Sequence, residues 1–198
     1  MKIIVIGATG TIGGEVAKAL SQKNHEVIGA SRKGDFKVSL EDPASVQALF
    51  DKVGKFDGVV VCTGDAVFKP FAQLTDADYE SSFRSKLMGQ ASVARYAVAH
   101  LNDGGSITLT SGVLAAQPIP GCAAVSAFTL GVEGFVRAVA LELPRGLRIN
   151  AVSPQWIKET MVKYGMDPTP GIAAADAAKF YVAAVEGSQQ GQIIEALP

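Results

Sequence analysis

Residues 2–20, KIIVIGATGTIGGEVAKAL, contain the feature that most constrains the fold of this chain: an apolar strand, a glycine-rich turn and a helix, in that order. Residues 3–6 are all β-branched and show no polar alternation, which is typical of a parallel strand covered on both faces. Gly7, Gly10 and Gly13 follow at a spacing of three residues. Each removes a Cβ where the backbone has to approach a ligand or a neighbouring strand.

The helix after this turn gives the motif its chemistry. A helix that starts near Ile12 directs its free N–H groups and the positive end of its dipole back at the turn. A pyrophosphate fits there, so the order strand, turn, helix predicts a dinucleotide site. Glycine triplets also occur in ordinary loops, and a plain tight turn is the alternative interpretation. The residues expected at the site are Gly7, Thr9, Gly10, Thr11, Ile12 and Gly13.

Length and charge place the chain among single-domain proteins. Its 198 residues suggest one domain over residues 1–198, and a hydrophobic content of 48% is ample for a covered sheet. Lys and Arg total 18 against 19 Asp and Glu, which gives a net charge of −1. Because no basic cluster provides an electrostatic footprint, we expect no binding to nucleic acid.

Targeting segments, cysteines and histidines offer few functional signals. The apolar run at the N-terminus stops at Gly7, too short for a signal-peptide core, and no stretch could span a bilayer, so we expect a cytosolic protein. Cys62 and Cys122 have neither CxxC spacing nor a nearby histidine, which predicts reduced thiols and no metal site. His25 and His100 lie beside polar residues at element ends, so we expect both to face solvent.

Strand and helix patterns alternate along the chain without a linker, a repeat or a low-complexity tract. This alternation predicts an α/β fold with a doubly wound parallel sheet and helices on both faces. Asp42–Pro43 and Thr75–Asp76 are expected helix starts. Strands are predicted near 2–6, 26–30, 36–39, 58–62, 106–110, 147–153 and 191–196, and helices near 12–23, 43–53, 76–101, 123–143 and 173–185.

The end of the second strand bears on the choice of dinucleotide. An NAD site places an acidic side chain there for the ribose 2′-hydroxyl, whereas an NADP site supplies a cation for the 2′-phosphate. Here the strand is followed by Ser31, Arg32 and Lys33, and a guanidinium beside a hydroxyl can hold a phosphate. This favours NADP over NAD. A solvated basic turn is the alternative, which the nearby Asp35 keeps open.

Four further segments resemble the short-chain dehydrogenase/reductase family, and the likeness covers essentially the whole chain. VVVCTG at 59–64 is similar to the family strand that ends in NNAG, and ITLTSG at 107–112 to its serine strand. PGCAAVSAFTLGVEGFVRAVALEL at 120–143 resembles the catalytic helix, and LRINAVSP at 147–154 the strand after it. The resemblance implies a Rossmann-type three-layer α/β/α domain, with further cofactor contacts from Ser39, Cys62, Thr63, Gly64, Pro154 and Ile157, beside Ser31 and Arg32.

The resemblance breaks at the residues that carry the family's proton chemistry. Ser111 matches the family serine, but Val125 stands where the family has its tyrosine and Thr129 where it has its lysine. Valine has no proton to transfer, and threonine carries no positive charge. There is no tyrosine between residues 112 and 163, so no shift of register restores the pair. The asparagine of the family's fourth helix is replaced by Lys86.

Two hypotheses follow from these substitutions. The first is an NADP-dependent oxidoreductase with a rearranged site, in which Lys86 and Ser111 are the candidate catalytic residues, because a desolvated lysine can work as an acid or base. Lys86 can equally be a structural residue that fills the space left by the missing pair. The second hypothesis is a non-catalytic NADP(H)-binding sensor or scaffold.

Substrate and assembly are open at this level. Only a short segment lies between Pro154 and Gly171, which implies a small or open pocket for a small-molecule substrate, if there is one. The family resemblance implies that the helices near 76–101 and 123–143 pair with their copies across a two-fold axis. We therefore expect a homodimer or a homotetramer.

Overall fold

The computed structural model describes residues 1–197, and within them six strands form one parallel sheet with the order β2-β1-β3-β4-β5-β6. β1 pairs with both β2 and β3, so the strand that leads into the glycine turn lies inside the sheet. All strands end at the same edge, where a ligand can bind. Their bounds are β1 Lys2–Ile6, β2 Glu26–Ala30, β3 Phe56–Val61, β4 Leu101–Thr110, β5 Arg148–Pro154 and β6 Ile193–Ala196.

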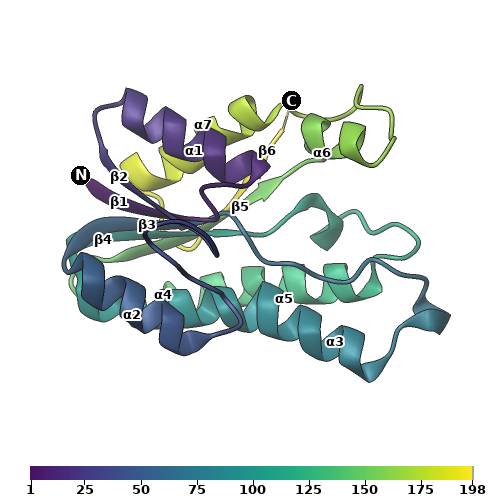
Figure 1. Cartoon of the computed structure of the whole chain (residues 1–198), viewed down its shortest axis with the longest axis horizontal. Coiled ribbons are helices and arrows are strands. Elements are labelled where there is room, and N and C mark those ends of the chain that lie inside the picture. Colours follow the sequence, from purple (N-terminus) through teal and green to yellow (C-terminus); the bar gives the residue numbers. More distant parts are fainter. Residues whose placement is uncertain (198) are drawn as a thin grey trace.

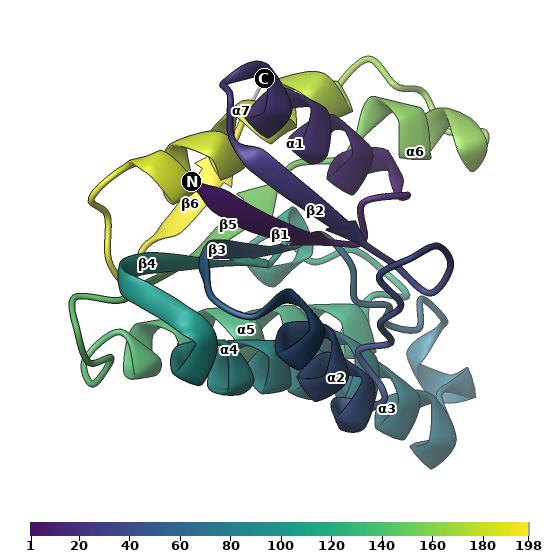
Figure 2. The ribbon, with the colours of Figure 1, turned by 60° about the vertical axis from the view of Figure 1, so that its left-hand side comes forward.

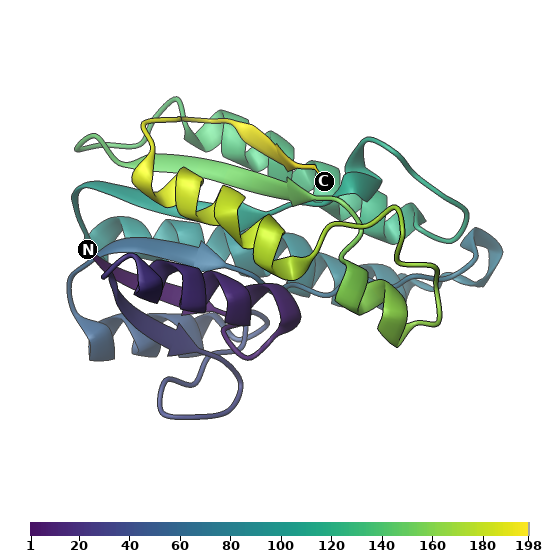
Figure 3. The ribbon, with the colours of Figure 1, turned by 90° about the horizontal axis from the view of Figure 1, so that it is seen from above.

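Helices cover both faces of the sheet and complete three layers, which confirms the predicted fold class (Figure 1). Seen from the side, the sheet lies between α1 and α7 above and α2, α4 and α5 below (Figure 2). The short α6 lies beyond the ends of the strands, next to α7 (Figure 3). The helix bounds are α1 Thr11–Gln22, α2 Pro43–Val53, α3 Asp76–Ser82, α4 Gly89–His100, α5 Ala123–Val139, α6 Lys158–Lys163 and α7 Ala174–Glu186.

The apolar run of β1 feeds two cores. Ile3 and Val5 belong to the core under α1 and α7, whereas Ile4 and Ile6 belong to the core on the other face. Successive side chains of a strand point to opposite faces, so an unbroken apolar run is what a doubly covered strand needs. All four are at most 1% exposed. Burial of each such side chain contributes roughly 1.5–3 kcal/mol to folding.

The predicted strand at 36–39 is wrong. Only an isolated bridge between Ser31 and Lys37 forms in this region. That bridge is parallel, and a longer parallel pairing needs a crossover of about a dozen residues or more, whereas far fewer separate Ser31 from Lys37, so the pairing does not extend into a strand.

Helix starts were predicted better than helix ends. Asp42 caps α2 by accepting a 3.0 Å hydrogen bond from the N–H of Ala44, and Thr75 caps α3 as expected. The predicted helix 76–101 consists of α3, a π-helical segment Phe83–Met88 and α4, and Leu101 already belongs to β4. The helix predicted at 123–143 ends at Val139, and α6 was not predicted.

Candidate functional site

The glycine turn joins β1 to α1 at the edge where the strands end. Gly7 has φ of +89°, a left-handed conformation that favours glycine, and a Cβ there would lie 3.0 Å from the Cβ of Thr63. A Cβ on Gly13 would lie 2.1 Å from the carbonyl oxygen of Gly7, so α1 packs directly on the turn. Gly10 is the N-cap of α1 and brings no side chain to the helix N-terminus. This end of α1 can therefore receive a phosphate group.

A cavity of about 670 Å³ lies beside the turn, and we name it the glycine-turn cavity. It brings together the turn, the segment after β2, residues 38–41 and the segment after β3, as expected for the predicted cofactor site. The predicted residues in its lining are Gly7, Thr9, Gly10, Ser31, Arg32, Ser39, Cys62 and Thr63, and the others are Ile6, Lys33, Val38, Leu40, Glu41, Asp65 and Ser85.

The basic residues after β2 lie on a short turn at the margin of this cavity. The hydroxyl of Ser31 donates to the carbonyl oxygen of Lys33 and accepts a 3.2 Å hydrogen bond from its N–H. Ser31 thus closes the turn that carries Arg32, whose side chain is exposed. Ser31 therefore fixes the turn, and the guanidinium of Arg32 is exposed and can bind a phosphate.

A second cavity, of about 420 Å³, adjoins the first, and we name it the lysine cavity because Lys86 lines it. The two cavities share Cys62, Thr63 and Asp65, so the segment after β3 forms their boundary. The other predicted residues in its lining are Ile12, Gly64, Ser111, Val125, Thr129, Pro154 and Ile157, joined by Thr110, Gly112, Val113, Leu114, Gln155, Trp156 and Thr160.

Sequence reasoning missed Asp65 and named two residues that line neither cavity. Asp65 follows Gly64 in the segment after β3, and its place near the end of a parallel strand was the signal that could have found it. Within residues 1–197, Thr11 and Gly13 line neither cavity. Both lie in the first turn of α1, where Gly13 serves the packing of the helix on the glycine turn.

Lys86 lines the lysine cavity and is held there by contacts with the end of β4. The π-helical segment presents it, and its ammonium donates to the carbonyl oxygens of Thr110 at 3.1 Å and Ser111 at 3.2 Å. Gln90, one turn later, donates to the carbonyl oxygens of Lys86 and Thr110 and so braces the same contact. Irregular π-helical turns often occur at functional sites.

Burial changes the acidity of this ammonium. The Lys86 side chain is 8% exposed, and desolvation lowers its pKa from 10.5 to about 8, while the charge of Asp65 acts in the opposite direction. The lysine is thus mostly protonated at neutral pH and gives up its proton more easily than an ordinary lysine. A group of this acidity can act as a general acid.

Ser111 is turned toward the interior. Its hydroxyl donates a 2.7 Å hydrogen bond to a carboxylate oxygen of Glu133 on α5, and both residues are buried. While this bond exists, the hydroxyl proton is not available to a substrate, although the oxygen can still accept a hydrogen bond.

The two positions that the sequence resemblance aligns with the family's tyrosine and lysine are joined by a hydrogen bond. Thr129 is 1% exposed, and its hydroxyl donates a 2.6 Å hydrogen bond to the carbonyl oxygen of Val125, one turn back on α5. Both line the lysine cavity. Neither residue brings a transferable charge to it, so Lys86 is the cation of this lining.

Among residues 1–197, the cysteines and histidines show no sign of metal binding or of a reactive thiol. Burial raises the pKa of Cys62 well above its ordinary value, and Cys122 is buried at the start of α5. The expectation that the histidines face solvent is wrong: both are half-buried and paired, His25 with Glu186 at 3.0 Å and His100 with Asp51 at 3.1 Å. In the described residues, no group of three or more His, Cys, Asp or Glu is arranged to hold a metal ion. No described helix has the length and apolar character of a membrane span.

Comparisons of sequence place this chain beside known reductases. A family profile described as enoyl-(acyl carrier protein) reductase matches residues 7–186. Hydroxynaphthalene reductase arp2 of Aspergillus fumigatus is 33% identical over 117 residues, which cover 59% of this chain and 43% of the relative. Tetrahydroxynaphthalene reductase PfmaG of Pestalotiopsis fici is 30% identical over 155 residues, 73% of this chain and 56% of the relative. The chain spans about half the length of these relatives.

Solved structures show the same arrangement of elements. The protein lin1944 from Listeria innocua matches with a TM-score of 0.93 and 36% identity, over 98% of each chain. A small-chain dehydrogenase in complex with NADPH matches with a TM-score of 0.87 and 27% identity, over 98% of this chain and 95% of the other.

Proposed function

Because the chain belongs to the short-chain dehydrogenase/reductase family, we propose that it binds NADP(H) and reduces a small carbonyl compound with it. The observation that carries the proposal is the boundary formed by Cys62, Thr63 and Asp65. A dinucleotide held at the glycine turn would extend across this boundary into the cavity that contains Lys86. A neighbour of the same fold is itself complexed with NADPH.

The residues of the glycine-turn cavity fit a dinucleotide. The absence of a Cβ on Gly7 lets Cys62 and Thr63 pack directly against the turn, and the N-terminus of α1 faces the turn, as a pyrophosphate requires. The guanidinium of Arg32 would bind a 2′-phosphate and so favour NADP(H) over NAD(H). When bound, NADPH supplies the hydride for carbonyl reduction.

In this proposal Lys86 provides the proton. As hydride reaches the carbonyl carbon, the ammonium of Lys86 transfers a proton to the carbonyl oxygen, which gives the alcohol and leaves a neutral amine that solvent protonates again. Its pKa of about 8 lies close to a neutral working pH, which suits a general acid. Ser111 remains a proposed site residue, but its oxygen can only accept a hydrogen bond while its proton is bound by Glu133.

The lining of the lysine cavity and the names of the relatives together suggest the substrate class. Trp156, Leu114 and Val113 give the cavity apolar walls beside the single ammonium. Two relatives are named for reductions in the naphthalene series. We therefore propose a planar or compact apolar ketone, aldehyde or quinone.

Binding and turnover would be measured separately. Calorimetry with NADPH and NADH tests the cofactor, and oxidation of NADPH with a panel of aldehydes, ketones and quinones tests the chemistry. We expect NADPH binding in the wild type, and turnover that Lys86→Met abolishes while NADPH binding persists. Turnover that persists undiminished in Lys86→Met would contradict the role of the lysine.

A specific observation also favours a second function, a non-catalytic NADP(H)-binding sensor or scaffold. The hydroxyl of Thr129 donates to the carbonyl oxygen of Val125, and neither of these two positions, which align with the family's tyrosine and lysine, brings a transferable charge to the lysine cavity. Tight NADPH binding with no turnover across the whole panel would make this the better conclusion.

We further propose that the chain forms a homodimer through α4 and α5. A groove of about 670 Å³ runs between these helices, and it is lined by Leu87, Met88, Phe135 and Val139 among others. Met88 is 43% exposed in the single chain. A second copy across a two-fold axis would cover this apolar surface.

A further inference from the structure

We propose that the carboxylate of Asp65 binds the hydroxyl groups of the ribose on the nicotinamide side of the dinucleotide. The inference rests on the proposed NADP(H) binding and adds to it a residue of this chain that would hold the second half of the cofactor.

The position of Asp65 singles it out. Only three residues line both cavities within the part of the chain that the structure describes, and the other two, Cys62 and Thr63, carry no charge. The pyrophosphate belongs at the glycine turn and the reacting ring in the lysine cavity, so the sugar between them must pass this boundary. Asp65 therefore brings the carboxylate beside which the second ribose would lie.

The chemistry of the group fits the sugar. An ionised carboxylate is an acceptor with two oxygens, and vicinal ribose hydroxyls are a pair of donors. Charge-assisted hydrogen bonds of this kind are stronger than neutral ones, and dinucleotide sites use an acidic side chain in this way on the adenosine ribose. The positive charge of Lys86 interacts favourably with the carboxylate of Asp65. This attraction offsets part of the repulsion between that carboxylate and the phosphates of the cofactor.

The backbone at Asp65 is fixed from the side of the π-helical segment. The N–H of Asp65 donates to the hydroxyl of Ser85 at 3.1 Å, and two residues later the N–H of Val67 donates to the hydroxyl of Ser82 at 2.9 Å. Both serines are at most 6% exposed. The segment that carries the carboxylate is thereby attached to the same helix that presents Lys86.

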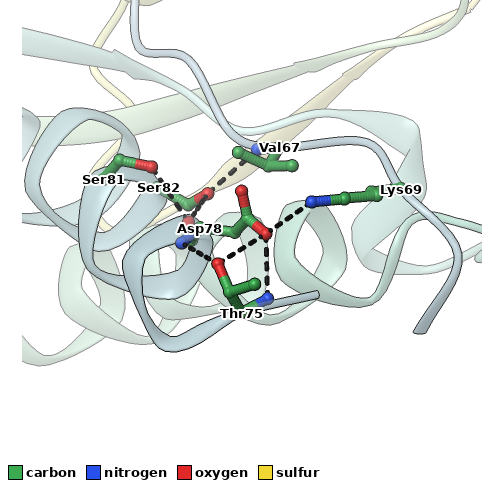
Figure 4. A network of polar contacts seen from close by, with 6 residues as sticks. All are labelled: Val67, Lys69, Thr75, Asp78, Ser81 and Ser82. Atoms are coloured by element: carbon green, nitrogen blue, oxygen red, sulfur yellow. Dashed lines mark hydrogen bonds and ion pairs between the residues drawn. The ribbon is translucent and has the colours of Figure 1, made fainter. Parts of the chain in front are cut away.

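A second set of contacts anchors the far end of the segment (Figure 4). Lys69 forms a 2.9 Å ion pair with Asp78, which also accepts from the backbone and the hydroxyl of Thr75 at the start of α3. The N–H of Lys69 donates to the carbonyl oxygen of Gly121 at 2.8 Å. These hydrogen bonds and the charge of Lys69 lower the pKa of Asp78 to about 2, so the anchor stays ionised at any working pH. The backbone that carries Asp65 is therefore held before the cofactor arrives, which reduces the ordering of this segment that binding requires.

The test compares three ligands with the same adenosine half. NADPH and 2′-phospho-ADP-ribose both contain the second ribose, whereas 2′,5′-ADP lacks it. Calorimetry with the full chain and with Asp65→Asn, an isosteric change that removes the charge, gives the affinity of each. The control variant Glu41→Gln removes a carboxylate that lines the glycine-turn cavity but not the boundary.

We expect Asp65→Asn to weaken NADPH and 2′-phospho-ADP-ribose about tenfold and to leave 2′,5′-ADP unchanged, because a charge-assisted contact is worth roughly 1.4 kcal/mol or more. Glu41→Gln should not distinguish the three ligands. Equal effects of Asp65→Asn on all three, or no effect on any, would overturn the assignment of Asp65 while leaving NADP(H) binding in place. Failure of the wild type to bind NADPH would instead overturn the proposed function and this inference with it.

Discussion

The hydroxyl of Ser111 donates a 2.7 Å hydrogen bond to the buried carboxylate of Glu133, and this bond ties the segment after β4 to the middle of α5. The other carboxylate oxygen lies 3.4 Å from the guanidinium of Arg137, a longer contact on a more exposed side chain. Ser111 thus provides the short hydrogen bond to a buried charge. A residue selected by resemblance to a catalytic serine therefore has a structural task that the sequence alone did not show.

Ser111→Ala should lower the free energy of unfolding by about 1.5–3 kcal/mol, because it removes a hydrogen bond to a buried charged group. Urea unfolding measures this. Ser81→Ala, which removes an exposed bond to the carbonyl oxygen of Asp78, should change stability by less than about 0.5 kcal/mol. Adding Glu133→Met to Ser111→Ala should restore part of the loss, since no charge is then left buried. An unchanged stability of Ser111→Ala would show that Glu133 finds another partner.

The pKa of Lys86, lowered by burial from 10.5 to about 8, predicts a dependence of stability on pH. Below about pH 8 the lysine is protonated in both states, so the full cost of burying its charge is present. Between pH 8 and 10.5 the unfolded chain binds more protons, and the folded state gains stability as the pH rises. The stability of the wild type relative to Lys86→Met should therefore increase by roughly 3 kcal/mol over this range.

Denaturant unfolding at several pH values from 7 to 10.5 measures that difference. Lys18→Met, at an exposed position of α1, is the control and should show no such trend. A constant difference between wild type and Lys86→Met would mean that the buried lysine keeps an ordinary pKa.

The fold could be predicted wherever local pattern and tertiary structure agree. The run at residues 3–6 is apolar because β1 is covered on both faces, and the caps Asp42 and Thr75 satisfy helix N–H groups locally. The strand at 36–39 failed because its residues suit a strand while the chain leaves no room for a crossover. The predicted helix ends were wrong for a related reason. Tertiary contacts determine that α5 ends at Val139 and that α4 ends at His100, directly before β4.

The sequence predicted which backbone segments meet at the candidate site. The glycine turn and the segment after β3 come together because parallel strands end at one edge of the sheet. Side-chain directions were not predictable in this way. The sequence does not show that Ser111 points to Glu133, nor that a π-helical turn carries Lys86 to the carbonyl oxygens after β4.

Arg32→Asp should lower the affinity for NADPH by about ten- to a hundredfold and leave NADH binding nearly unchanged or improved, because a phosphate contact is replaced by repulsion. Calorimetry with both cofactors measures the gap between them. Lys18→Asp makes the same change of charge on α1 outside the cavity and should affect both cofactors alike. Equal affinities of the wild type for NADPH and NADH would remove the argument for a 2′-phosphate site.

Met88→Glu should convert the proposed homodimer to monomers, because it places a charge in the apolar groove between α4 and α5. Met88 is partly exposed in the single chain, so the fold should tolerate the change. Light scattering at micromolar concentration gives the mass. Leu141→Glu, at a residue that is 89% exposed and does not line the groove, should remain dimeric. A monomeric wild type would contradict the assembly.

Placing a tyrosine and a lysine at the positions that align with the family's pair, by Val125→Tyr with Thr129→Lys, should raise carbonyl reduction only slightly, about tenfold at most, although a general acid can contribute 10²–10⁴. The reason is Lys86: a lysine at position 129, which is 1% exposed, would bring a second ammonium into the lining that already holds one. Adding Lys86→Asn, the family's residue, should raise the rate further in this background, whereas Lys86→Asn alone should lower it. NADPH oxidation by the four proteins measures these rates. If Lys86→Asn changed the rate in the same direction in the wild type and in the Val125→Tyr/Thr129→Lys variant, the ammonium groups of Lys86 and of the new lysine would not compete for one site.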